Sequence, residues 1–122
     1  MELLPQVIEE ILQADNKALA SYGKHNINVV PVSTIRIVDN KILLMNYFLK
    51  KTLDNIVKNP HIALSCWKGL SGYQIKGTVE YIEDGDIFEE AKEWVKRNVQ
   101  NRTLKGLLII TPENVYNISP KV

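Results

Sequence analysis

The feature that most constrains the fold is a succession of short β-branched and apolar segments joined by tight turns. These segments span residues 18–22, 27–38, 41–46, 61–67, 73–82, 104–111 and 115–118. Tight turns such as Asp39-Asn40 join antiparallel neighbours, and this many strands in 122 residues tend to close on themselves. We therefore expect residues 1–122 to form one mainly β domain, a small antiparallel β-barrel with peripheral helices.

Two residues predict irregularities within these strands. Pro31 has no N–H to donate, so it should mark a sheet edge, a bulge or a switch between sheets. Gly77 lies inside a long alternating strand, where it indicates a bulge or the close approach of another backbone.

Three segments carry helical patterns. Apolar residues recur on one stripe over residues 5–14 and again over 87–99. A shorter helix is expected to begin at Thr52 and to end near Asn59, because Pro60 prevents its continuation.

The start of that short helix is a candidate anion site. The first amides of a helix lack intrahelical acceptors and carry the positive end of its dipole. Lys50 and Lys51 come directly before the expected start, so two ammonium groups would join these amides around a phosphate. The alternative is that Thr52 only caps the helix and the lysines are solvated.

Composition narrows the functional classes. The net charge of +1 provides no general attraction for nucleic acid or an anionic membrane. With one cysteine and two histidines, neither a disulfide framework nor a zinc cluster is expected, and Cys66 should be a buried structural thiol. The sequence shows no signal-peptide pattern and no apolar run of membrane-spanning length, so we expect a cytoplasmic protein.

Five short motifs occur in order along the chain. They are N-Y-F-L-K-K-T at 46–52, N-P at 59–60, A-L at 63–64, Trp67, and Y-Q-I-K-G at 73–77. Together they resemble the pyridoxamine 5′-phosphate oxidase-like flavoproteins, and the length and the K-T-x-x-N run are similar to small bacterial FMN-binding proteins. The resemblance implies an antiparallel split β-barrel that binds FMN, and a homodimer with the flavin at its interface.

The resemblance also implies where the phosphate and the ring of FMN would bind. Lys50 and Lys51 match the basic pair that holds the phosphate, and Thr52 would add a hydroxyl and an amide. Met45 and Asn46 match the positions that border the isoalloxazine ring.

The remaining site residues come from two other strands. Val30, Val32 and Ser33 match the facing strand, which contacts the ring edge and ribityl chain largely through its main chain. Gln74 matches a glutamine that reaches the flavin, in family members often from the second subunit.

Three departures from the family pattern bear on activity. Leu49 stands where the oxidases have a serine before the basic pair, and the arginine expected near Val32 is absent, although Arg36 follows. The C-terminal motif that serves pyridoxal phosphate synthesis has no counterpart before Val122. True pyridoxamine phosphate oxidase activity is therefore not expected.

The sequence leaves several functions open. The first is an FMN-dependent oxidoreductase acting on an unidentified substrate, with the redox chemistry carried by the flavin. The second is a non-enzymatic FMN electron-transfer protein, and a third is a split barrel that holds the deazaflavin F420 or haem. A barrel that binds single-stranded nucleic acid is disfavoured by the near-neutral charge.

Overall fold

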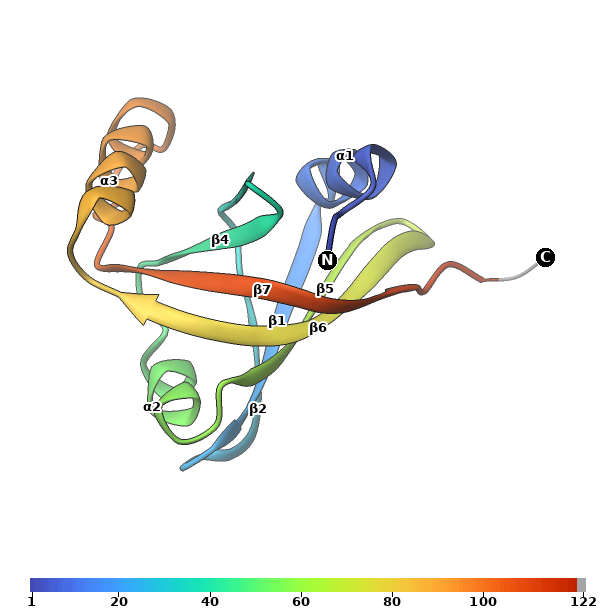
Figure 1. The fold of residues 1–122 in the computed structure, drawn as a ribbon, viewed down its shortest axis with the longest axis horizontal. Helices are drawn as coiled ribbons and strands as arrows, with labels where there is room; N and C mark the ends of the chain where they lie inside the picture. Colours follow the sequence, from blue (N-terminus) through green and yellow to red (C-terminus); the bar gives the residue numbers. More distant parts are fainter. Residues whose placement is uncertain (121–122) are drawn as a thin grey trace.

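Seven antiparallel strands and three helices make up residues 1–120, the part of the chain that the computed structural model describes (Figure 1). The elements are α1 (Pro5–Gln13), β1 (Asn16–Gly23), β2 (Asn26–Pro31), β3 (Ile35–Val38), β4 (Lys41–Asn46), α2 (Lys50–Lys58), β5 (His61–Lys68), β6 (Ser71–Ile82), α3 (Asp86–Asn98) and β7 (Gly106–Asn117). The prediction of a mainly β chain with peripheral helices is confirmed. None of the helices within these residues has the length and apolar character needed to cross a membrane.

The sheet closes through a short crossing segment, residues 32–34. The strand order is β2-β1-β5-β6-β7-β4-β3, so the two edge strands, β2 and β3, follow one another in the chain. Val32 N–H donates to the Lys17 carbonyl (3.0 Å) and Met45 N–H donates to the Thr34 carbonyl (3.1 Å). The segment thus bonds to both halves of the sheet, and Pro31 ends an edge strand, as predicted.

Strand β4 is buried on both faces. Ile42 and Leu44 belong to the core inside the barrel, whereas Leu43 and Met45 belong to a second core on the outer face. Helix α3 covers that second core, to which it contributes Phe88, Ala91 and Val95. Two cores on opposite sides of one strand explain why β4 is an unbroken apolar run rather than an alternating one.

Cys66 belongs to the core inside the barrel. Its side chain is buried, and this burial raises the pKa of the thiol to about 11. The prediction of a structural rather than a reactive thiol fits this environment.

Two boundary predictions are wrong. Strand β7 runs continuously from Gly106 to Asn117, although the sequence suggests two strands separated at Pro112. Pro112 lies opposite Gly77, where the β6–β7 register shifts between Lys76 and Gly77, so its missing N–H falls at an irregular point of the ladder. Helix α2 begins at Lys50, two residues before the expected start at Thr52.

Gly77 is predicted to be essential to this bulge. A Cβ atom at this position would collide with the carbonyl oxygen of Thr111 on β7. Gly77→Ala should therefore lower the free energy of unfolding by about 1–3 kcal/mol, measured by urea denaturation. Glu113→Ala, at an exposed position on β7 beside the same bulge, is the matched control and should change stability by less than about 0.5 kcal/mol. Equal stabilities of the two variants would contradict the prediction.

Candidate functional site

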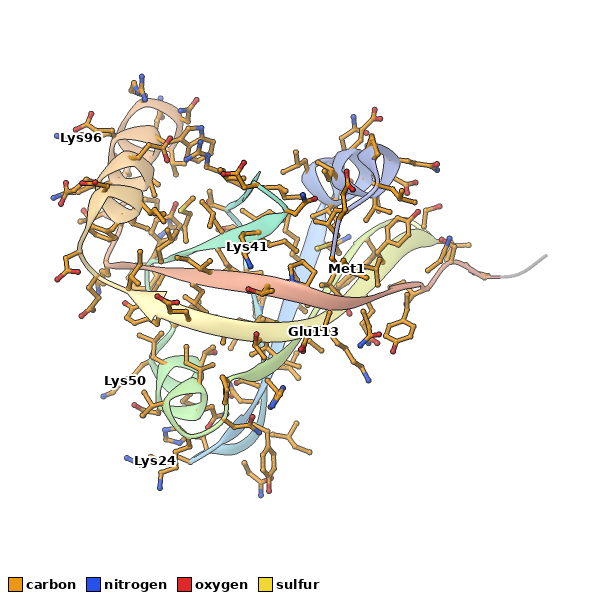
Figure 2. The ribbon with its side chains drawn as sticks, in the orientation of Figure 1. Met1, Lys24, Lys41, Lys50, Lys96 and Glu113 are labelled. Atoms are coloured by element: carbon orange, nitrogen blue, oxygen red, sulfur yellow. The ribbon has the colours of Figure 1, made fainter. Side chains whose placement is uncertain are left out.

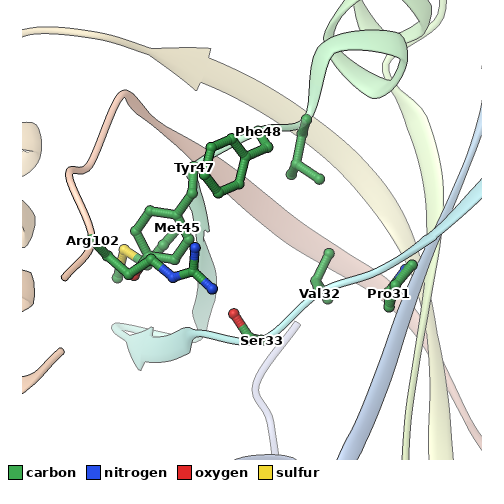
Figure 3. A pocket seen from close by; sticks show the side chains of 8 residues that line it. Pro31, Val32, Ser33, Met45, Tyr47, Phe48 and Arg102 are labelled. Carbon is green, nitrogen blue, oxygen red and sulfur yellow. The ribbon is translucent and has the colours of Figure 1, made fainter. Parts of the chain in front are cut away.

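A cleft of about 320 Å³ opens where the crossing segment faces the end of β4 (Figure 3). One wall consists of residues 31–33 and the other of Met45 and residues 47–49. Arg102, in the segment between α3 and β7, extends into the cleft from the side. The volume lies at the lower end of the range of small-molecule sites, and the walls are mainly apolar.

The structure brings three of the nine predicted site residues together in this cleft. Val32, Ser33 and Met45 line it. Val30 is half-buried and packs against the core inside the barrel instead. Gln74 lies on β6, directly across from Ser65 of β5 and Tyr116 of β7, and is not among the lining residues.

Asn46 holds the turn that forms one wall of the cleft. It is buried; its Oδ1 accepts a hydrogen bond from Leu49 N–H (2.8 Å), and its Nδ2 donates to Tyr81 Oη (2.9 Å). These bonds hold the turn from β4 into α2, which forms the second wall. The predicted site residue Asn46 thus positions the turn, and its side-chain amide is already engaged within the chain.

The N-terminus of α2 adjoins the cleft. Leu49 lines the cleft and is also the N-cap of α2, without a side-chain hydrogen bond to the helix. Lys50 and Lys51 occupy the first turn and are exposed, and Figure 2 shows Lys50 extending away from the sheet. Thr52 is buried inside that turn, with Oγ1 3.5 Å from Asn28 Nδ2, so it is not the helix cap. Because no side chain caps the helix, its positive end remains available to an anion.

A buried asparagine fixes α2 against the barrel. Asn55 Oδ1 accepts from His25 N–H (2.7 Å), and its Nδ2 donates to Ser21 Oγ (3.1 Å) and to the Asn26 carbonyl (3.0 Å). Gly23 lies against the Asn55 backbone, since a Cβ atom there would sit 2.5 Å from the Asn55 carbonyl oxygen. The β1–β2 turn therefore holds the helix whose first turn carries the lysine pair.

One ion pair reinforces this contact on the surface. His25 Nε2 lies 2.8 Å from Asp54 Oδ2. The hydrogen bond from His25 lowers the pKa of the Asp54 carboxyl, with smaller contributions from the charges of Lys24, His25 and Lys50.

Four further residues around the cleft were not predicted from the sequence. Tyr47 and Phe48 line it, and Arg102 Cζ lies 5.6 Å and 5.5 Å from their ring centroids. Lys105 Nζ lies 5.2 Å from the centroid of Phe48. The sequence offered a signal only for Tyr47 and Phe48, which form an aromatic pair within the motif that leads into the two lysines. In the structure Phe48 is 72% exposed.

A larger cavity, of about 530 Å³, lies elsewhere, between the β3–β4 hairpin and α3. It contains none of the predicted site residues, and its polar lining is mostly acidic (Asp39, Asp86, Glu90) and includes Lys41. The smaller cleft is the better candidate for an anionic cofactor because it adjoins the lysine pair and the start of α2.

Sequence comparison with known families identifies the family of this chain. Residues 4–119 match the family described as pyridoxamine 5′-phosphate oxidase. The chain belongs to this family. An uncharacterized protein of Methanocaldococcus jannaschii, MJ0282, is 33% identical over 96 residues, which is 75% of this chain and 64% of that protein. The chain thus spans about two thirds of the length of this curated relative.

Several solved structures share the fold of this chain. HupZ of Group A Streptococcus superposes with a TM-score of 0.85 at 22% identity, covering 99% of this chain and 98% of that one. An FMN-binding protein from Syntrophomonas wolfei gives 0.78 at 14% identity, covering 96% and 89%. HutZ, the haem storage protein of Vibrio cholerae, gives 0.70 at 13% identity, covering 95% and 94%. The predicted split β-barrel is confirmed.

The His25–Asp54 contact predicts a pH dependence of stability. Because the pKa of Asp54 in the folded protein lies below its ordinary value of 3.8, its stabilising effect is present above that value. The effect is lost as the pH falls through the lower, folded pKa. We expect the stability difference between wild type and Asp54→Asn to shrink below about pH 4 in urea denaturation at stepped pH.

The control is His25→Gln, followed by NMR titration of the Asp54 carboxyl. Removal of the imidazole should return the pKa of Asp54 toward 3.8. An unchanged titration curve would show that His25 is not the cause of the shift.

Proposed function

We propose that this chain binds FMN in the cleft between residues 31–33 and 45–49 and acts as an FMN-dependent oxidoreductase. The observation that carries the proposal is the continuity between the cleft and the uncapped start of α2. Leu49 belongs to both, and Lys50 and Lys51 follow it directly. An apolar slot ending at a cationic helix terminus suits a ligand with a flat ring at one end and a phosphate at the other.

The residues present fit the two ends of FMN. A dianionic phosphate needs charge-assisted donors, which the two ammonium groups and the first amides of α2 can supply. Val32, Met45 and Leu49 offer apolar surface for the ring, and Ser33 offers a polar group at its edge. The FMN-binding protein of Syntrophomonas wolfei, which shares the fold, supports the same cofactor for this chain.

The role proposed for the protein groups is binding and orientation. When bound, FMN supplies hydride or electron transfer, which no protein side chain provides. Main-chain groups of the crossing segment would border the ring edge, and the α2 lysines would anchor the phosphate. The donor and the acceptor are small molecules or proteins still to be identified.

Electron transfer without turnover is the second candidate. The cleft is open to solvent along its aromatic side, where Phe48 is exposed, and an exposed flavin could exchange electrons with a protein partner. Turnover of NADH or NADPH with an added acceptor favours the enzyme. A bound flavin that is reduced and reoxidised without turnover favours the carrier.

Haem fits the described residues less well. The two histidines lie outside the cleft: His25 pairs with Asp54, and His61 is exposed at the start of β5. Neither imidazole is therefore placed to ligate iron in the cleft. The deazaflavin F420 remains the alternative cofactor to test beside FMN, because it too joins a ring system to a phosphate.

A homodimer is part of the proposal because one face of the sheet lacks a cover. Across β2, β1, β5, β6 and β7, directly paired residues form an outward row of Pro31, Ala18, Ser65, Gln74 and Tyr116. Helices α1 and α2 pack on the inner side, and α3 covers the outer side of β4 and β7. Within residues 1–120 no helix covers this row, which begins at the cleft. A second copy on this face would explain how Gln74, remote from its own cleft, could reach a flavin.

The lysine pair gives the direct test of cofactor binding. Purified protein titrated with FMN should quench flavin fluorescence and show the absorption of a bound flavin. Lys50→Ala/Lys51→Ala should weaken binding by about 100-fold, since two charge-assisted contacts to phosphate are lost. Riboflavin, which lacks the phosphate, should bind the wild type weakly and be insensitive to the double substitution.

The matched control is Lys58→Ala/Lys92→Ala, which removes two exposed lysines at the far end of α2 and on α3. This control should bind FMN as the wild type does. Failure of the wild type to bind FMN would overturn the proposal. Tighter binding of F420 or haem in parallel titrations would identify that molecule, and not FMN, as the cofactor.

The dimer is tested at the centre of the uncovered face. Ser65→Glu places a carboxylate in the middle of the outward row, directly across from Ala18 and Gln74, where the monomer leaves it in solvent with no cation opposite it. A buried charge at a subunit interface should nevertheless dissociate the dimer, giving half the mass in light scattering. Lys92→Glu, on exposed α3, is the control that should remain dimeric. A monomeric wild type would contradict the proposal.

A further inference from the structure

The larger of the two cavities described above, of about 530 Å³, has no part in the proposed flavin site. It lies between the β3–β4 hairpin and the first turn of α3, which stand on the same side of β7 in Figure 1. Its apolar lining comes from four residues on four different elements: Val38, Leu43, Ile87 and Ile109. A volume of this size is within the range of small-molecule sites, and apolar walls with a few polar groups are their usual lining.

Two of the apolar side chains that line this cavity are left in solvent. Ile87, on α3, is 53% exposed, and Val38, at the end of β3, is 38% exposed. Leu43, between them on β4, is buried. An apolar group bound in the cavity would remove Ile87 and Val38 from water, and this burial would supply the non-directional part of the affinity.

Contacts at both walls keep the cavity open at a fixed width. Arg36, on β3, lies with Cζ 5.0 Å from the ring centroid of Trp94, and its Nη1 bonds Glu90 Oε2 at 2.8 Å. This residue therefore ties β3 to α3. At the hairpin turn, Asn40 Oδ1 accepts a hydrogen bond from Leu3 N–H (2.8 Å). Because the walls are held in this way, a ligand would not have to order them, and its binding would cost less conformational entropy.

The charges around the cavity do not balance. Glu90 is matched by Arg36, and Lys41 Nζ donates to a threonine hydroxyl on β7 (2.8 Å). Asp39 and Asp86 have no ion-pair partner within residues 1–120. Three carboxylates are therefore accompanied by two cations, which leaves one negative charge in excess. A single positive charge on a ligand would balance it.

We propose that this cavity binds a small organic cation, a molecule with an amine at one end and an apolar body of one or two rings. The apolar walls would hold the body, and Asp39 and Asp86 would accept hydrogen bonds from the ammonium group. The excess negative charge selects a cation over a neutral or anionic molecule of the same shape. The site shares no lining residue with the flavin cleft, although Leu43 and Met45, two residues apart on the outer face of β4, line one cavity each.

The test measures binding to the protein without FMN, so its outcome does not depend on the proposed function. Tryptamine is the probe, and tryptophol and indole-3-acetate are its neutral and anionic counterparts with the same ring system. Isothermal titration calorimetry at low ionic strength should show tryptamine binding at least about tenfold more tightly than tryptophol, and indole-3-acetate more weakly still. Amide chemical-shift changes in NMR spectra should centre on Leu43, Ile87 and Ile109.

A double substitution assigns the preference for a cation to the two aspartates. Asp39→Asn/Asp86→Asn removes both charges and keeps the shape of both side chains, and asparagine suits the left-handed backbone at position 39 (φ 50°). This variant should lose about tenfold in affinity for tryptamine and keep its affinity for tryptophol. The matched control is Asp84→Asn/Glu89→Gln, which removes two exposed carboxylates near the start of α3 that do not line the cavity, and it should behave as the wild type.

A second variant tests the apolar wall. Ile87→Ser changes an exposed residue, so the fold should tolerate it, and it should weaken tryptamine and tryptophol by a similar factor of about five. Val57→Ser, at an 85% exposed position on α2, is the control that should bind both compounds as the wild type does.

Four results would overturn the inference. They are an absence of saturable tryptamine binding to the wild type, equal affinities for tryptamine and tryptophol, a preference for the cation that survives Asp39→Asn/Asp86→Asn, and chemical-shift changes confined to residues 31–33 and 47–49. The last result would place the amine in the other cleft. A wild type that binds tryptamine but no FMN would refute the proposed function alone.

Discussion

The burial of β4 on both faces is the constraint on which the rest of the structure depends. Leu44 packs inward against the barrel core, and Met45 packs outward under α3. A shift of the β4 register by one residue would therefore place each of these side chains in the other core. The register of β4 fixes where the strand ends, at Asn46. That end in turn fixes the turn at 47–49 and the start of α2. The cleft and its adjoining helix terminus are thus consequences of how one strand is packed.

The order of the elements could be predicted because local sequence patterns mark where most elements begin and end. Strand β4 appears at the predicted residues, since Asp39-Asn40 marks its beginning and the apolar run marks its extent. The start of α2 could not be predicted as well, because Thr52 looks like a cap until tertiary packing buries it. Likewise, Pro112 suggests a break in β7 unless the bulge opposite it, at Gly77, is known.

The candidate site also contains residues that could be predicted from the sequence and residues that could not. Val32, Ser33 and Met45 could be placed at the cleft because the family resemblance matches them to positions beside the ring, and Asn46 and Asn55 prove to be the amides that hold its framework. Arg102 could not be placed, because its contact with Phe48 joins segments far apart in the chain and depends on how α3 returns to β7. Long-range contacts of this kind leave no periodic or motif signal.

The crossing segment at 32–34 couples ligand binding to the stability of the fold. This segment is at once the seam that joins the two sheet edges and one wall of the cleft. A molecule bound against this segment would contact both halves of the sheet and add buried apolar contacts between them. The folded population would then rise with ligand supply, by RT ln(1 + [L]/Kd) in free energy. Chains made when that ligand is scarce would therefore have a smaller folded population.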